Sequence, residues 1–129
     1  MTLTMIIILV LALYGLQIFV QETSRFGFDV AGIVGNRDTQ PEMSVLAARL
    51  DRAKNNMLES LPVFLALALL ALIKGTDSAM LSGAALVFLI ARAGYVPAYA
   101  SGIPLLRSLF WLAGTGSLIV MAFAILQQG

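Results

Sequence analysis

The sequence predicts an all-α integral membrane protein, a four-helix bundle whose four transmembrane helices form one domain over residues 1–129. Composition is the first reason: 60% of the residues are hydrophobic and 12% are charged, whereas soluble domains carry about 45–50% apolar and about 25% charged residues. The second reason is that the apolar residues gather in four uncharged stretches. The length of 129 residues also corresponds to a single domain.

Each uncharged stretch is assigned to one membrane span. A spanning helix needs about 20 mostly apolar residues, and residues 3–20 and 108–129 nearly meet this unaided. The middle stretches, 61–73 and 79–91, reach it only with polar residues at one end. The alternative for these two is a pair of short buried helices in a soluble protein, but so few charges do not cover this much apolar surface. The expected spans are residues 2–22, 45–73, 79–99 and 104–127.

The first span is expected to stay in the protein, because it lacks a basic segment before it and a small-residue cleavage site after it. The connections between spans differ in character. Residues 74–78 and 100–104 are short turns, whereas the loop over 22–44 is long and polar. The long loop carries four residues typical of turns, namely Gly27, Gly32, Gly35 and Pro41.

The basic residues predict the orientation in the membrane, because cytoplasmic loops are enriched in Lys and Arg. On one side of the predicted bundle, Lys74 is the only basic residue. The others lie in or toward the 22–54 loop and the 92–107 turn: Arg25, Arg37, Arg49, Arg52, Lys54, Arg92 and Arg107. We therefore expect the 22–45 and 100–104 loops to face the cytoplasm and both termini to lie outside.

Charge and composition exclude several classes of function. The net charge of +1 does not suit an ordinary electrostatic nucleic-acid binder. The chain contains no Cys and no His, which excludes thiol nucleophiles, Ser-His-Asp triads, zinc fingers and haem ligation by His. No metal site is expected. Any thiol chemistry in this protein needs a thiol that a ligand brings in.

The second predicted helix carries the most chemistry. At about 100° per residue, Arg49, Arg52, Asn56 and Glu59 share one stripe about 80° wide. Counted from the far end of the helix at about 1.5 Å per residue, Glu59 lies about 21 Å in and Asn56 about 25 Å in. Arg52, at about 31 Å, sits at the edge of a hydrocarbon core about 30 Å thick. Two polar side chains are thus expected inside the membrane.

The third predicted helix repeats this pattern. Arg92, Tyr95 and Tyr99 follow an i, i+3, i+7 spacing and share a face. Arg92 lies about 20 Å from the start of its helix, which is the depth expected for Glu59. A charge at mid-membrane is costly unless it is paired or faces a wet cavity. We therefore predict an ion pair between Glu59 and Arg92.

Ordinary membrane roles compete with a binding role for these residues. Arg49, Lys54 and Arg107, which opens the fourth helix, are also explained as interface anchors that snorkel. Tyr95, Tyr99 and Trp111 are also explained as an aromatic belt, and the ion pair as a structural lock only. These explanations do not account for the gathering of basic, amide, acidic and tyrosine side chains at one depth. That gathering predicts a pocket for a polar anionic ligand, open toward the cytoplasm.

These residues resemble the motifs of a known family, the MAPEG family of membrane-associated proteins in eicosanoid and glutathione metabolism. Its second-helix signature resembles the pattern Arg49-x-x-Arg52-Ala53-x-x-Asn56-x-x-Glu59-x-x-Pro62-x-Phe64. Its third-helix motif and fourth-helix start resemble Arg92-x-x-Tyr95-x-x-x-Tyr99 followed by Arg107. Size, four spans and the long first loop match as well, so the resemblance covers essentially the whole chain. Two stretches are most similar to the bacterial branch, Tyr95-Val96-Pro97-Ala98-Tyr99 and Gly35-Asn36-Arg37-Asp38.

The resemblance implies a homotrimer of left-handed bundles that binds glutathione between neighbouring subunits near the cytoplasmic face. It implies a bacterial inner membrane as the location. Carried over position by position, it makes Arg107 the arginine that stabilises the thiolate, with Ser108 as a weaker candidate donor. It makes Arg92 the partner of the Glu59 carboxylate. The positions implied to contact glutathione are Arg49, Arg52, Asn56, Glu59, Tyr95 and Tyr99.

The implied function is a glutathione-dependent transferase or peroxidase acting on lipophilic electrophiles that enter from the bilayer. Arginines hold carboxylates by bidentate, charge-assisted hydrogen bonds, and a nearby guanidinium lowers the pKa of a thiol. Conjugation, peroxide reduction and isomerisation remain open. The alternative is a non-enzymatic bundle that binds lipid headgroups or a protein partner through the same basic rim. A small transporter subunit is a third possibility, but it needs charges along a whole pathway, and the extracellular halves of the helices are apolar.

Overall fold

The structure, a computed structural model, describes residues 1–26 and 44–128. Four helices make up this part of the chain: α1 (Leu3–Phe26), α3 (Val45–Lys74), α4 (Ala79–Ser101) and α5 (Pro104–Gln127). Each is long and apolar enough to cross a membrane, which confirms the four-helix fold class. The turn residues expected in the first loop and the 35–38 motif lie outside the described residues, as does the side chain of Arg25.

The helix ends are fixed by capping residues. The Ser44 hydroxyl accepts a hydrogen bond from the backbone N–H of Ala47 at 3.1 Å, and Ser78 does the same for Leu81 at 3.1 Å. Each hydroxyl satisfies one of the N–H groups that a helix start leaves without a partner. Gly75 ends α3 and Gly102 ends α4 with φ of 69° and 76°, a left-handed conformation that glycine adopts without strain. These caps produce the two short turns of the bundle.

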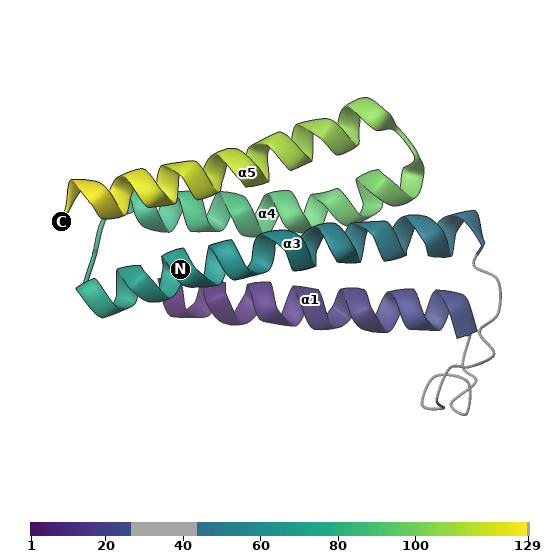
Figure 1. Cartoon of the computed structure of the whole chain (residues 1–129), viewed down its shortest axis with the longest axis horizontal. Helices are drawn as coiled ribbons and strands as arrows, with labels where there is room; N and C mark the ends of the chain where they lie inside the picture. The colour runs from purple at the N-terminus through teal and green to yellow at the C-terminus, as the bar shows by residue number, and fades with distance from the viewer. Residues whose placement is uncertain (27–43, 129) are drawn as a thin grey trace.

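The helices pack as two antiparallel pairs, seen one above the other in Figure 1. The pair α4 and α5 has the most extensive contact, and α1 lies along α3. Contacts of α3 and α1 with α4 join the two pairs. The turns at 75–78 and 102–103 lie at opposite ends of the bundle (Figure 1). The first loop therefore leaves α1 and enters α3 at the end where α4 passes into α5.

The core is apolar and centred on an aromatic stack between α3 and α4. The Phe64 and Phe88 rings are 4.5 Å apart between centroids and nearly parallel, at 7°. Ile6, Val10 and Met121 are fully buried in the same cluster. Large apolar side chains are also exposed on the outer faces of all four helices, as expected where lipid replaces water as the solvent. Pro62 and Pro97 are accommodated inside α3 and α4.

Candidate functional site

Arg92 is the most deeply placed cation of the bundle's described part, with 2% of its surface exposed. Its guanidinium donates a hydrogen bond to the Asn56 side-chain oxygen. It also lies 5.4 Å from the centre of the Phe88 ring and 5.6 Å from that of Tyr95. These contacts give the buried charge an amide acceptor and two aromatic faces. They tie α3 to α4 beside the candidate site, through Asn56 and Tyr95.

The predicted ion pair between Glu59 and Arg92 is not formed in this chain. Among the described residues no ion pair joins them, and Glu59 is exposed on the outside of α3. The reason is the rotation of α3, whose buried stripe is set by Phe64. At about 100° per residue, Asn56 lies about 80° from Phe64 and Glu59 about 140° from it. Arg92 therefore meets Asn56, and Glu59 stays on the exposed side of α3.

Tyr99 lies between two arginines near the end of α4. Its hydroxyl accepts a hydrogen bond from Arg52 Nε at 3.0 Å. The guanidinium carbons of Arg107 and Arg52 lie 5.0 Å and 5.6 Å from the centre of its ring. Tyr95 contacts the same ring edge-on, at 5.6 Å between centroids. Side chains from α3, α4 and α5 thus meet at one aromatic ring, as the sequence predicted for residues at this depth.

Arg49 lies at the end of this group, against the last residues of α4. It donates a hydrogen bond to the backbone oxygen of Ala100 at 3.2 Å. A Cβ added at Gly102 would lie 2.8 Å from Arg49 Nη1, so the left-handed glycine also makes room for the guanidinium. Arg49 therefore holds the end of α4 against α3, a structural role beyond the binding role predicted for it.

Two cavities open on this group. One has a volume of about 340 Å³, and its wall includes Arg49, Arg52, Tyr99 and Arg107. The other has a volume of about 540 Å³ and lies over the first turns of α5. Its lining consists of Asn56, Tyr95, Tyr99, Arg107, Ser108, Trp111 and Leu112. Tyr99 and Arg107 line both cavities, so the two form neighbouring parts of one site.

The structure thus gathers most of the predicted site residues in these walls, whereas Glu59 and Arg92 line neither cavity. Sequence reasoning missed the apolar part of the wall, which is formed by Trp111 and Leu112. Their spacing held the necessary information: Trp111 follows Arg107 by four residues, and Leu112 follows Ser108 by four. Residues four apart share a helix face.

The chemistry of the two walls suits an anion with an apolar neighbour. The cavity bounded by Arg49, Arg52 and Arg107 contains no acidic side chain in its lining, and guanidinium groups match carboxylates and phosphates in geometry and charge. The larger cavity combines Arg107 and Ser108 with an indole and a leucine. An anionic group and a lipophilic group can therefore lie on either side of Arg107.

The model of a family described as the MAPEG family matches residues 1–127 of the 129-residue chain. No curated protein matches the chain.

Proposed function

The chain belongs to the MAPEG family, and on this basis we propose that it is a glutathione-dependent membrane enzyme that acts on lipophilic electrophiles. Family membership and four spanning helices establish an integral multi-pass membrane protein of the glutathione and eicosanoid metabolism family. The observation that carries the finer proposal is the placement of Tyr99 and Arg107 in the walls of both cavities. One molecule bound there has anion-binding groups on one side and an apolar wall on the other.

In this proposal the basic cavity holds the carboxylates of glutathione. Arg52 and Arg49 point charge-assisted donors at that space, and such donors bind carboxylates about twice as strongly as neutral ones. Asn56 and Tyr95 line the larger cavity and offer neutral polar contacts to the peptide part. Glu59, exposed on α3, would meet the ligand's ammonium only from outside this protomer's cavities.

Arg107 then acts on the thiol. A thiolate, not a thiol, is the nucleophile, and a guanidinium nearby lowers the pKa of the thiol. The sulfur attacks the electrophilic atom, forms the new bond, and the leaving group departs with its electron pair. Ser108 is the candidate hydrogen-bond donor beside it. Trp111 and Leu112 provide the surface on which an acceptor from the bilayer lies close to the sulfur, and proximity supplies much of the rate.

We further propose that the protein is a homotrimer with the site near the subunit boundary. Glu59 and Arg52 are exposed on the outer side of α3, and Glu59 is expected at membrane depth. A charge facing lipid is costly, so a neighbouring subunit is the natural cover. The location proposed is a bacterial inner membrane, with the 22–45 and 100–104 loops in the cytoplasm.

A non-enzymatic function remains the second candidate, because the same arginines suit the phosphate of an anionic lipid headgroup. The exposure of Arg52 and the open edge at Ile103 support access from the membrane surface. This candidate gives no role to the placement of Arg107 beside Ser108 and Trp111.

One experiment separates the two candidates. The protein is purified in detergent, glutathione binding is measured by calorimetry, and conjugation to a lipophilic aryl halide is followed optically. The enzyme proposal expects saturable glutathione binding, turnover, and tight binding but no turnover with S-methylglutathione, which lacks a free thiol. Anionic lipid that binds in place of glutathione, with no turnover, would establish the second candidate instead.

A further inference from the structure

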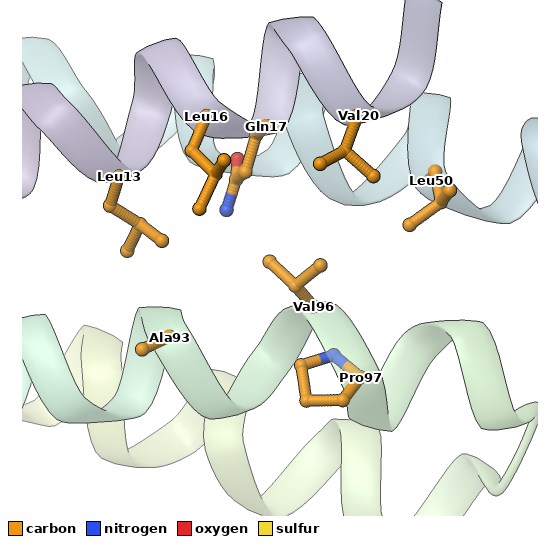
Figure 2. A pocket seen from close by; sticks show the side chains of 8 residues that line it. All are labelled: Leu13, Leu16, Gln17, Val20, Leu50, Ala93, Val96 and Pro97. Atoms are coloured by element: carbon orange, nitrogen blue, oxygen red, sulfur yellow. The ribbon is translucent and has the colours of Figure 1, made fainter. Parts of the chain in front are cut away.

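A third cavity, of about 290 Å³, lies between α1 and α4. Figure 2 shows it from close by, with side chains of α1 on one side and those of α4 on the other. Its volume is close to the lower limit of the range of about 300–1,000 Å³ found for small-molecule sites. The residues that line it are Leu13, Leu16, Gln17, Val20, Leu50, Ala93, Val96 and Pro97.

Gln17 is the one polar side chain among the described residues of this lining, and 6% of its surface is exposed. Its two amide atoms have different surroundings. Oε1 is sealed inside the protein and accepts no hydrogen bond from the described residues. The amide nitrogen points into the cavity, on the side of Val96 (Figure 2). Unlike Oε1 it keeps accessible surface, and it donates to no described residue. The apolar wall therefore contains one open N–H donor.

This donor lies inside the hydrocarbon layer of the membrane. Counted at about 1.5 Å per residue from Leu3, where α1 begins, Gln17 is about 21 Å along a hydrocarbon core about 30 Å thick. It is thus about 9 Å inside the core, whereas the glycerol esters of phospholipids belong to the interfacial layer outside it. The hydrocarbon offers no water to an open N–H. An acceptor at this depth must come with a lipophilic molecule.

The lining decides which acceptor suits the cavity. A water molecule held in a buried site needs about two to four polar partners, and the side chains of this wall offer one. A hydrocarbon chain fills the volume but leaves the N–H unpaired. A hydroxyl accepts from the N–H, but its own proton finds no acceptor among the lining side chains, because Oε1 of Gln17 is sealed. A carbonyl oxygen accepts and has no proton to place.

We propose that this cavity binds a lipophilic carbonyl compound, a ketone or a quinone, whose oxygen accepts a hydrogen bond from the amide nitrogen of Gln17. Such a molecule reaches the site from the bilayer, because Leu16, Ala93 and Pro97 are exposed along its edge. Its apolar body contacts the rest of the wall. The binding is non-covalent and involves no reaction.

This site is separate from the one around Tyr99, so the proposal does not rest on the proposed function. No residue lines both it and either of the two charged cavities. At about 100° per residue, the face of α4 with Ala93, Val96 and Pro97 lies about 130° around the helix from Tyr95 and Tyr99. A ligand in one cavity does not fill the other.

The test compares three probes that share one ring skeleton: α-tetralone carries a carbonyl, α-tetralol carries a hydroxyl in its place, and tetralin carries neither. Their binding to the full chain in lipid nanodiscs, without glutathione, is measured by equilibrium dialysis against empty nanodiscs of the same lipid. We expect α-tetralone to bind about tenfold more tightly than tetralin, the effect of one buried hydrogen bond. The alcohol should bind less tightly than the ketone. The infrared C=O stretch of bound α-tetralone should move to lower frequency, as for a carbonyl that accepts a hydrogen bond.

Gln17→Met removes the donor and keeps the length of the side chain. In this variant the ketone and tetralin should bind alike, with tetralin affinity kept, and the infrared shift should disappear. Gln17→Leu serves if Gln17→Met fails to fold, as judged by helical circular dichroism. Three results would each overturn the proposal: equal affinity of ketone and tetralin for the parent, tighter binding of the alcohol than of the ketone, or a ketone preference that survives without Gln17.

Two bulky substitutions place the ketone. Ala93→Phe fills the cavity and should abolish binding, whereas Val87→Phe, on the exposed surface of the same helix and outside the cavity lining, should leave it unchanged. Leu16→Trp narrows the cavity from α1 and serves if Ala93→Phe fails to fold. Binding that persists in the cavity-filling variant would contradict the proposed site.

The choice of lipid tests whether the bilayer's own carbonyls occupy the donor. The ketone is titrated into nanodiscs of ester-linked phospholipid and of ether-linked phospholipid, which lacks carbonyl groups. We expect equal affinity in both, because the esters lie above the depth of Gln17. Weaker binding in the ester-linked lipid would mean that lipid esters fill the site, and the proposal of a separate carbonyl ligand would fall.

Discussion

The guanidinium of Arg92 donates its hydrogen bond to Asn56 and not to the carboxylate of Glu59. The bond crosses from α4 to α3 among side chains that are expected to lie in the membrane. The hydrogen-bond acceptor of Arg92, which has 2% of its own surface exposed, is therefore a neutral amide. The two helices are joined there by a bond that a change in either residue removes, and this defines the first prediction.

Asn56→Ala should destabilise the fold by about 1–3 kcal/mol, because it leaves a buried guanidinium without its hydrogen-bond acceptor. Arg92→Leu removes the charge itself, and adding Arg92→Leu to Asn56→Ala should recover part of the loss. Thermal unfolding in detergent gives the four corners of this double-mutant cycle. Glu59→Gln is the matched control on the same helix, and its stability should stay within about 1 kcal/mol of the parent's. A larger loss in this control than in Asn56→Ala would contradict the geometry.

Gly94 sets how closely α4 approaches α5. A Cβ at this position would lie 2.7 Å from Cζ of Phe110, so Gly94→Ala forces the ring to move. Overpacking of this kind costs about 1–3 kcal/mol. Gly83→Ala, on the same helix, meets nothing within 4 Å and should stabilise the protein by up to about 1 kcal/mol through helix propensity. Unfolding temperatures that fall equally in both variants would show that contact with Phe110 is not the cause.

Arg107→Ala should act on chemistry more than on binding. Loss of the guanidinium raises the pKa of the bound thiol, so the thiolate absorbance in the ultraviolet appears only at higher pH. Turnover should fall by about 10²-fold or more, the range seen when one electrostatic stabiliser is removed. The glutathione affinity should change little.

Arg52→Ala should instead act on glutathione binding more than on the chemical step. It removes a proposed carboxylate contact that is made before and during the reaction alike, so glutathione affinity falls while the thiolate signal at saturation remains. Calorimetry and an ultraviolet pH titration on both variants measure the two effects. If Arg52→Ala abolishes the thiolate signal and Arg107→Ala preserves it, the two assignments must be exchanged.

The trimer is tested by detergent-corrected mass from light scattering, with three chains per particle as the expected result. Small residues in α5 permit close packing against another helix, but two of them are used inside the protomer. Gly114 lies against Arg92, where an added Cβ would be 3.0 Å from Nε, and Ser117 donates to the Gly114 carbonyl at 2.6 Å. The exposed Glu59 is the stronger reason to expect a covering subunit. A stable monomer in mild detergent would rule the trimer out.

The orientation is open to cysteine labelling, because the natural chain has no Cys. Asp77→Cys places one exposed thiol in the turn after α3, and Ser101→Cys places one at the last residue of α4, at the opposite end of the bundle. A membrane-impermeant maleimide added to intact cells should label Asp77→Cys only, and both after lysis. Labelling of Ser101→Cys alone in intact cells would invert the proposed topology.

The spans were predictable because they depend on the length of uncharged stretches, which the sequence states directly. The meeting of Arg52, Tyr99 and Arg107 was also predictable, since residues at one depth on neighbouring helices lie close together. Both inferences need only rise per residue and chain direction, and neither depends on how a helix is turned about its axis.

The choice between Asn56 and Glu59 was not predictable in this way. Both share a stripe and differ in depth by less than one turn, so the partner of Arg92 depends on the rotation of α3. That rotation is set by the stacking of Phe64 on Phe88, a contact between residues far apart in sequence. The position of Gln17 depends likewise on which side of α1 faces α4.

The ring of Tyr99, which stands between Arg52 and Arg107, has a consequence for affinity. Two like charges are kept at fixed places by cation–π contacts and a hydroxyl, with no anion required. Much of the rotational freedom of these long side chains is therefore lost when the protein folds and not when a ligand arrives. An incoming anion meets donors that are already oriented, and the entropic penalty of ordering flexible side chains, about 0.5–1.5 kcal/mol for each one immobilised, is largely removed from the binding step.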